Sequence, residues 1–350
     1  MSQPPTVLVV DGNSLLHRAF HASARTMYRD LQGQQAWAVR GLLSQLLAAV
    51  DRVCADVVVV GFDDRGNSRR KRQWPVYKAQ REPKPDALTR QLDLAVEVLR
   101  GLGVVVVVPE GLEADDVLAS VAAQAPAHGA QTVVATSDRD SFALIDEHTR
   151  MLRILNGGVD ASPLLDPDRL AMVTGVRPEQ YADLAALRGD ASDNLPGVRG
   201  FGAKTAVKLL QALGTAEAAF DDASHGGEQC RAAVGAARAT ALGEPEARER
   251  WAFNREVMEM VRDACTLDVA TGRLPLDEEA VRATYERFEL HVPGAVRALT
   301  LREPTRVVTE PVGERWVDPR WTAAPRATGP LPRLVPATSR GPAYVQEALF

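Results

Sequence analysis

"TVLVVDG", residues 6–12, is an apolar, β-branched run that leads into an acid, Asp11, and three further stretches of the chain likewise end in polar or acidic residues. They are "DVVVVGFDD" (56–64), "VVVVVPE" (104–110) and "QTVVATSDRD" (131–140). Short apolar runs of this kind are typical of strands buried on both faces of a parallel sheet. Helical patterns lie between them, at 36–53, 87–103 and 113–125. The alternation predicts an α/β fold with a mostly parallel, twisted sheet flanked by helices.

The bulk composition predicts a cytoplasmic protein. The 350 residues, 45% hydrophobic and 25% charged, are enough for two domains of about 100–200 residues each. No apolar run approaches the roughly 20 residues that span a bilayer, and the N-terminus lacks the pattern of a secretory signal. Cys54, Cys230 and Cys265 show no C-x-x-C spacing, which argues against a disulfide framework and a zinc site. The formal net charge of -5 argues only weakly against nucleic-acid binding, because charges of one sign are segregated along the chain.

The second half of the chain has a different pattern. From about residue 170 the strand patterns stop, and stretches such as "PEQYADLAALRG" (178–189) and "AKTAVKLLQALG" (203–214) predict helices. After about residue 301 the sequence is rich in Pro, Arg and Thr without periodicity, and it cannot bury enough surface to fold alone. We therefore expect an α/β domain at 1–170, an all-helical domain at 171–300 and a flexible tail at 301–350.

Acidic residues recur where the predicted strands end, which is where function lies in open parallel sheets. They are Asp11, Asp63, Asp138 and Asp140 at strand ends, Glu113, Asp115 and Asp116 at the start of a helix, and Asp190 and Asp193 in the helical half. If these carboxylates converge, they repel one another unless cations are bound. Two Mg²⁺ or Mn²⁺ ions are the natural occupants, and such a pair supports phosphodiester cleavage. Helix caps and solvated loop ends are the alternative, which explains any one acid better than acids from four separate segments.

A basic stretch directly follows Asp63. "RGNSRRKRQWPVYKAQR" (65–81) contains no acid, and its basic residues are Arg65, Arg69, Arg70, Lys71, Arg72, Lys78 and Arg81. Trp74 and Tyr77 add aromatic faces on which bases could stack. The alternative is that residues 65–81 form an ordinary solvated surface loop. The absence of acids and the neighbouring predicted metal site argue against that interpretation.

A glycine-rich turn precedes a helix in "LPGVRGFGAKTAVKLLQALG" (195–214). Gly197, Gly200 and Gly202 permit positive φ and leave backbone N–H groups bare, so a phosphate can dock at the start of the helix. Lys204 and Lys208 add positive charge for a nucleic-acid backbone without selecting a sequence. The G-x-x-x-x-G-K-[ST] spacing of a P-loop is absent, which disfavours an enzyme that uses nucleoside triphosphates.

Six ordered motifs resemble the flap endonuclease and 5′-3′ exonuclease family, which includes the N-terminal nuclease domain of bacterial DNA polymerase I. They are "VDGNSLLHRAFHA" (10–22), "VGFDD" (60–64), "YKAQR" (77–81), "GLEADDVLAS" (111–120), "TSDRD" (136–140) and "GDASDNLPGVRGFGAKTA" (189–206). The resemblance covers about residues 6–295. It implies a PIN-like or resolvase-like nuclease core, a helical arch near 65–85 and a helix-hairpin-helix (H3TH) domain that grips duplex DNA. The implied activity is metal-dependent cleavage at DNA 5′ ends and 5′ flaps in replication and repair, with 5′-phosphate products.

The resemblance also implies roles for individual residues. All nine acids named above match the family's metal-site carboxylates, for two or more ions. Lys78 and Arg81 match the basic pair that faces the scissile phosphate, with Tyr77 as the adjacent aromatic residue and Arg70 as a basic residue of the arch. The hairpin with Gly197, Gly200 and Gly202 matches one that also binds a monovalent cation such as K⁺. The nucleic-acid contacts implied are Arg18, Arg69, Arg72, Gly197, Gly200, Gly202, Lys204, Thr205 and Lys208.

The chain departs from the family pattern in places. Some relatives carry a basic residue at the position of Ala185, and Arg188 lies nearby as a substitute. The arch is more basic than usual, and the chain ends without a polymerase domain, so we expect a stand-alone, monomeric member. His17 and His21 are spaced i, i+4, and we expect packing or DNA contact from them rather than metal ligation.

The chain ends in "QEALF", which resembles the peptide that docks bacterial proteins on the replication sliding clamp. Gln346, Leu349 and Phe350 match its pattern, and an exposed Leu-Phe pair on a polar tail suits an apolar pocket. The sequence is also compatible with two other functions. The protein could be an RNA-directed nuclease with a similar acidic core, or a non-catalytic DNA-binding protein. The complete set of acids argues against the second.

Overall fold

The first strand, β1 (Thr6–Asp11), lies in the middle of a six-stranded sheet with the order β3-β2-β1-β4-β5-β6. The computed structural model describes residues 4–26, 28–29, 33–292 and 294–300, all within one compact unit. The other strands are β2 (Val57–Gly61), β3 (Val105–Val107), β4 (Gln131–Thr136), β5 (Thr149–Arg153) and β6 (Leu164–Leu165). Strands β1 to β5 pair in parallel, and β6 is antiparallel to β5. The predicted parallel sheet is confirmed, and β5 and β6 add an edge that the sequence analysis missed.

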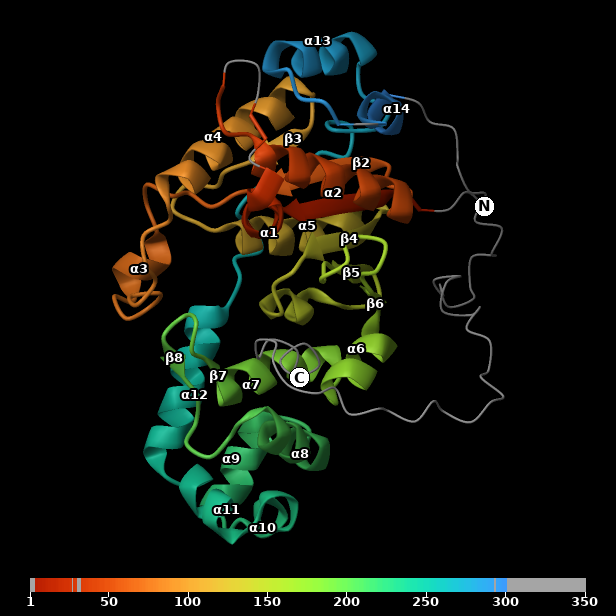
Figure 1. The fold of residues 1–350 in the computed structure, drawn as a ribbon. Coiled ribbons are helices and arrows are strands. Elements are labelled where there is room, and N and C mark those ends of the chain that lie inside the picture. The colour runs from red at the N-terminus through yellow and green to blue at the C-terminus, as the bar shows by residue number, and fades with distance from the viewer. Residues whose placement is uncertain (1–3, 27, 30–32, 293, 301–350) are drawn as a thin grey trace, which may run out of the picture. The chain divides into compact units, whose positions relative to one another are not determined.

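Helices cover both faces of this sheet (Figure 1). Side chains alternate between faces along a strand, so Val7 and Val9 of β1 share one core with Val57 and Val59 of β2. Helix α5 (Ala114–Gln124) covers that core. The helices α1 (Gly12–Ser23), α2 (Trp37–Val53) and α4 (Asp86–Gly101) pack against one another and against β1, β2 and β3. Shorter helical segments are η1 (Ala24–Thr26), α3 (Arg69–Gln73), η2 (Ala125–His128) and η3 (Asp140–Leu144).

The helical half begins with α6 (Pro167–Thr174) and α7 (Pro178–Arg188). It continues with α8 (Ala203–Leu213), α9 (Ala216–Ser224), α10 (Glu228–Val234), α11 (Ala236–Leu242) and α12 (Pro245–Met258). The expectation that this half is all-helical is wrong in one place, because β7 (Gly189–Asp190) and β8 (Leu195–Pro196) form an antiparallel pair. Strands of two residues carry no readable period. The core of this half is continuous with η3, through contacts such as Phe142 against Tyr181.

After α12 the chain returns to the sheet. Gly272 accepts a hydrogen bond from the backbone N–H of Val58 at 3.1 Å, and Leu274 donates one to the carbonyl of Asp56 at 2.8 Å. The last helices, α13 (Glu278–Phe288) and α14 (Ala295–Thr300), contact α4 and α2 respectively. The sequence assigned 171–300 to one helical domain, whereas these contacts group residues 272–300 with the α/β part. Helical periodicity does not say which core a helix packs against.

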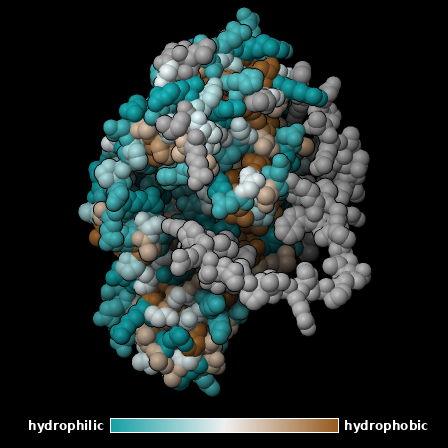
Figure 2. Space-filling model, viewed as in Figure 1, coloured by the Kyte–Doolittle hydropathy of each residue, from teal (hydrophilic) through white to brown (hydrophobic). Residues whose placement is uncertain are grey.

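The surface gives no sign of a membrane anchor within the part of the chain that the structure describes. There, no helix is long and apolar enough to cross a bilayer. On the face drawn in Figure 2, hydrophilic side chains cover most of the described surface, and apolar side chains are scattered among them. The large apolar side chains that are exposed in the described ranges are Val76, Val108, Met172 and Val173.

Candidate active site

The strand order reverses between β1 and β4, which are neighbours in the sheet. In open parallel sheets, ligands bind outside the carboxyl ends of the strands at such a point. Asp11 is the last residue of β1, and Asp138 and Asp140 follow β4. Asp11 also caps α1, since its Oδ1 accepts the N–H of Ser14 at 2.8 Å, and its Oδ2 accepts the hydroxyl of Thr136 at 2.9 Å. These bonds fix the first carboxylate at the edge of the sheet.

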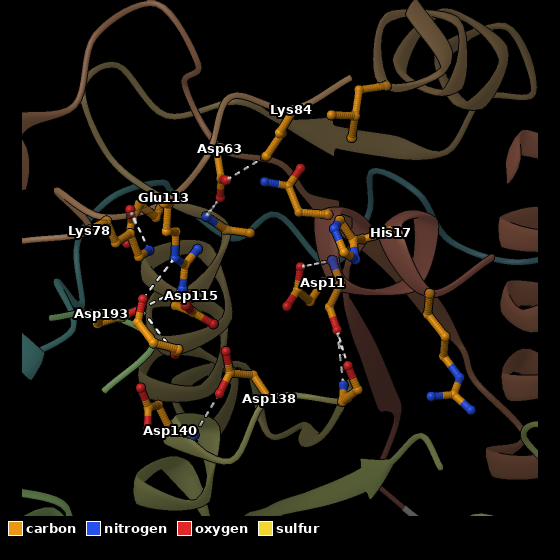
Figure 3. Close-up of a pocket in the computed structure, with 18 of the residues that line it drawn as sticks. Asp11, His17, Asp63, Lys78, Lys84, Glu113, Asp115, Asp138, Asp140 and Asp193 are labelled. Atoms are coloured by element: carbon orange, nitrogen blue, oxygen red, sulfur yellow. Dashed lines mark hydrogen bonds and ion pairs between the residues drawn. The ribbon is translucent and has the colours of Figure 1, made fainter. Parts of the chain in front are cut away.

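Seven of the nine predicted acids line one pocket of about 940 Å³. They come from five segments of the chain and face a common space (Figure 3): Asp11, Asp63, Glu113, Asp115, Asp138, Asp140 and Asp193. The Oδ1 atom of Asp115 is buried and has no hydrogen-bond partner. Leaving a buried carboxylate oxygen unpaired costs free energy, so this atom marks a position that a cation or a water completes.

Burial and mutual repulsion favour the protonated form of several of these carboxyl groups. Burial, with repulsion from Asp63 and Asp138, raises the pKa of Asp11 to about 7. Burial and repulsion from Asp138 raise the pKa of Asp140 to about 7. Burial, with repulsion from Asp11 and Asp138, raises the pKa of Asp115 well above its usual range. The ionised cluster is therefore unfavourable unless positive charge compensates it.

The donor set suits hard divalent cations, which prefer carboxylate oxygens. Within the described ranges, no three His, Cys, Asp or Glu side chains come close enough together to enclose an ion. The acids therefore line an open space and do not form a closed cage of ligands. Mg²⁺ keeps several waters and uses few protein ligands, so it fits such a space. The unpaired oxygen of Asp115 and the raised pKa of Asp11 are the features that a bound cation would relieve.

Asp116, which the sequence analysis expects among the metal ligands, lies outside the pocket lining. Its carboxylate is fully buried and accepts from both terminal nitrogens of Arg70 at 2.7 Å. It also accepts the backbone N–H groups of Glu113 at 2.9 Å and Val261 at 2.8 Å. These four bonds occupy the acceptor positions of the carboxylate. Asp116 therefore links α5 to Arg70 and to the backbone at Val261, and it does not face the pocket.

Asp190 is also outside the pocket lining. Its Oδ1 accepts the backbone N–H and the hydroxyl of Ser192, both at 2.7 Å, although its charge still contributes to the raised pKa of Asp140. Arg188 lies near these acids: burial opposes its charge, but Tyr181, Asp140 and Asp190 outweigh burial and raise its pKa. Ala185 is buried. The basic group near this side of the cluster is thus Arg188.

The basic stretch forms one short helix, α3, followed by turns. Arg70 lines the pocket but is only 7% exposed. It also donates to the carbonyl of Glu259 at 2.7 Å, so its guanidinium is already bonded within the protein and anchors the stretch. Tyr77 is 5% exposed and packs with Leu195, Val257 and Trp74. Tyr77 lines the pocket, but both its ring and its hydroxyl are in use within the protein, which leaves little of the ring for a base to stack on.

Lys78 and Arg81 lie in the pocket lining, as expected. Lys78 Nζ is 2.9 Å from Glu113 Oε1, and Tyr77 donates its hydroxyl to Glu113 Oε2 at 2.9 Å. Arg81 forms an ion pair with Asp193. Burial opposes ionisation of Glu113, but Lys78 and its other polar neighbours outweigh burial and lower its pKa. The two cations thus neutralise one side of the carboxylate cluster.

The predicted residues of α1 are also in the pocket. Arg18 donates to Asn156 Oδ1 at 2.9 Å, and the rings of His17 and His21 are 4.5 Å apart. Arg69 and Arg72 are exposed on α3. The pocket-lining polar residues that the sequence analysis missed are Asn13, Ser14, Glu82, Lys84, Ser137, Asn156 and Ser192. Lys84 could have been found from its place three residues after Arg81, whereas Asn156 carries no signal in one sequence.

The predicted phosphate cradle leads into α8. Gly202 is the N-cap of α8 and has open space where a side chain would be, and Gly200 has φ +86°. Gly197 serves packing instead, because a Cβ there would lie 2.1 Å from the carbonyl oxygen of Arg188. Lys204 and Lys208 are exposed on α8, with Thr205 partly buried between them. The predicted clamp peptide, Gln346, Leu349 and Phe350, lies outside the described residues.

A mostly parallel sheet with carboxylates at the ends of its strands, followed by a helical domain, defines an open α/β protein with an acidic site at the point where the strand order reverses. A family model for the 5′-3′ exonuclease N-terminal resolvase-like domain matches residues 6–172, and a model for the 5′-3′ exonuclease C-terminal SAM fold matches residues 176–280. The chain belongs to the 5′-3′ exonuclease family. The predicted fold class is thereby confirmed.

Individual relatives agree with this family. DNA polymerase I of Mycobacterium bovis is 34% identical over 292 residues, which cover 82% of this chain and 31% of the relative. Thermostable DNA polymerase I of Thermus aquaticus is 41% identical over 213 residues, covering 61% of this chain and 24% of the relative. The chain thus spans about a third of the length of the first of these curated relatives.

Two solved structures share the fold. The T5 5′-exonuclease with bound divalent metal ions (zinc) has a TM-score of 0.59 at 19% identity and covers 81% of this chain and 99% of its own. Human GEN1 in complex with Holliday junction DNA has a TM-score of 0.54 at 15% identity and covers 85% of this chain and 73% of its own.

Proposed function

We propose that the protein is a metal-dependent, structure-specific 5′ nuclease that hydrolyses phosphodiester bonds at the 5′ ends and 5′ flaps of DNA. The observation that carries this proposal is the pocket in which seven carboxylates from five segments meet Lys78 and Arg81. Membership of the 5′-3′ exonuclease family supports the same reaction. The T5 relative with bound divalent ions and the GEN1 relative with bound DNA support the cofactor and the substrate.

The acids that line the pocket are the residues that would hold Mg²⁺ or Mn²⁺. Asp115, with its unpaired oxygen, and Asp11, with its raised pKa, have most to gain from such an ion. A pair of bound divalent ions supplies activation of a water and stabilisation of the leaving 3′ oxygen. Asp116 and Arg70 keep the start of α5 and the basic stretch in register beneath the pocket.

Lys78 and Arg81 bind the phosphate in this proposal. In the free protein their charges are compensated by Glu113 and Asp193. A scissile phosphate that enters the pocket competes for the same ammonium and guanidinium groups, which then offset the extra negative charge of the transition state. The expected product carries a 5′-phosphate.

The hairpin before α8 is proposed to hold the backbone of the duplex. The bare N-cap at Gly202 and the exposed Lys204 and Lys208 suit phosphate contacts that carry no sequence preference. A K⁺ ion between this hairpin and the DNA remains part of the proposal, as do a monomeric state and clamp docking through Gln346, Leu349 and Phe350.

The proposal is tested by incubating the purified protein with a 5′-end-labelled DNA flap and with a matched RNA strand in the presence of Mg²⁺. We expect release of short labelled products from the DNA flap, with a 5′-phosphate at the new end of the remaining strand. Preferential cleavage of the RNA strand would replace DNA by RNA as the substrate. Binding of the flap without any cleavage would make the protein a non-catalytic DNA-binding protein.

Lys204→Ala is expected to weaken binding of duplex and flap DNA alike, because the lost ammonium contacts phosphate only. The slope of log K against log salt should become shallower by roughly 1, the value for one phosphate contact. The measurement is DNA affinity by anisotropy across a salt series, with Arg282→Ala on α13 as a matched surface control. An unchanged slope for Lys204→Ala would remove this residue from the DNA-binding surface.

A further inference from the structure

The basic stretch is bonded to the turn between β7 and β8 at three successive points. Asn194 donates its side-chain amide to the carbonyl of Val76 at 2.9 Å. Lys78 donates its backbone N–H to the carbonyl of Asp193 at 2.9 Å, and Arg81 Nε donates to the carbonyl of Ser192 at 3.3 Å. The turn between β7 and β8 (Figure 1) is therefore bonded to the segment that carries Lys78 and Arg81, the two basic side chains of the proposed active site.

Each of the two bonded segments contains a residue with an unusual backbone conformation. Lys78 has φ +54° and Asn194 has φ +59°, and each is a non-glycine residue in the left-handed region. Bulky residues adopt this region only where their surroundings hold them there, and such residues concentrate at functional sites. Asn tolerates left-handed φ better than most residues, and its short amide can bond to nearby backbone groups. One residue thus provides both the turn and the donor.

The left-handed conformation of Lys78 decides where its side chain goes. Nζ lies 4.6 Å from the centre of the Tyr77 ring and 2.9 Å from Glu113 Oε1, and the side chain is only 13% exposed. A return of Lys78 to an ordinary β or α conformation would point its Cβ in another direction, away from Glu113. The backbone of Lys78 is fixed from one side by Asp193 and, two residues earlier, by the amide of Asn194.

We propose that Asn194 is a positioning residue that holds Lys78 in its left-handed conformation and so delivers the Lys78 ammonium to the scissile phosphate. This inference rests on the proposed nuclease function. Asn194 does not line the pocket, so it acts through Lys78 and not on the substrate. The turn that it occupies also carries Asp193, so one short segment places a carboxylate and a cation of the site together.

The test is a double-mutant cycle between Asn194→Gly and Lys78→Ala on a DNA flap. Gly keeps the left-handed backbone and removes only the amide, while Asn194→Asp keeps the size of the side chain and removes its donor. In the wild-type background, both Asn194 variants should reduce kcat by about threefold to tenfold, the effect of one lost hydrogen bond, with KM unchanged. In the Lys78→Ala background the same changes should alter kcat by less than about twofold, because non-additivity marks residues that act as a unit.

Equal losses of kcat in both backgrounds, or no loss in the wild-type background, would overturn the inference. A second measurement does not depend on activity: the rate of chemical acetylation of Lys78 without DNA, read by peptide mass spectrometry. It should rise about fivefold to tenfold in Asn194→Gly while the rate at Lys84 stays unchanged, because the Lys78 ammonium is released from Glu113. An unchanged rate at Lys78 would also refute the inference. If the wild-type protein does not cleave the flap at all, the proposed function fails, and acetylation still decides the role of Asn194.

Discussion

Asp138→Ala is expected to reduce cleavage of a 5′ flap by more than about 10³-fold. The reason is that both the binding of the divalent cations and the stabilisation of the transition-state charge depend on this carboxylate. Asp138 is exposed, it lines the pocket, and its charge acts on Asp11, Asp115 and Asp140. Its removal leaves the fold intact, because the main bond of its side chain is local, from the N–H of Asp140 at 3.0 Å. The measurement is single-turnover cleavage in excess Mg²⁺.

The same variant should fold as well as the wild-type protein or better when no divalent ion is present. Removing one negative charge from the cluster relieves repulsion that raises the pKa of Asp11 and Asp115. Thermal unfolding in EDTA checks this, and Asp221→Ala on α9 is a matched control because Asp221 is exposed and its ion pair is with the surface residue Arg248. Cleavage by Asp138→Ala at the wild-type rate, or a lower unfolding temperature in EDTA, would contradict the account.

Lys78→Ala is expected to lower kcat by about 10²- to 10³-fold, the range found when one preorganised donor to a developing charge is removed. Flap affinity should change little, because exposed cations elsewhere supply most of the attraction for the DNA backbone. Steady-state kinetics with flap titrations separate the two quantities. The control is Lys71→Ala, which removes an exposed lysine of α3 from the same stretch. A loss confined to KM would make Lys78 a binding residue and not a catalytic one.

The sheet could be predicted because its central strands are long enough to form recognisable runs of apolar residues. β1, β2 and β4 each contain an uninterrupted run of apolar residues, whereas β5, "TRMLR", carries two arginines and β7 and β8 have two residues each. The carboxylates at strand ends could be predicted because parallel strands bring their carboxyl ends to one edge. Which core the last helices join could not be predicted, since it depends on contacts such as Val58 with Gly272.

The contacts within the site that the sequence does not reveal have a common physical cause, which is pairing over long sequence separations. Asp115 and Asp116 are adjacent, but successive residues of a helix point about 100° apart. Asp115 therefore faces the pocket while Asp116 turns to Arg70, which is 46 residues away in the chain. A run of basic residues suggests exposure of each, and Arg70 is buried only because this acid compensates it. The bond from Asn194 to Val76 spans 118 residues and escapes sequence analysis for the same reason.

The most direct test of the central claim is a calorimetric titration of the metal-free protein with Mn²⁺, in which the wild-type protein is compared with Asp115→Asn. The account predicts saturable binding of two ions with release of protons, because carboxyl groups such as Asp11 and Asp140, with pKa values of about 7, ionise when a cation arrives. Binding should be much weaker in Asp115→Asn, which keeps the shape of the side chain and removes its charge. No saturable binding by the wild-type protein, or identical binding by the variant, would contradict the claim that these acids gather to hold divalent cations.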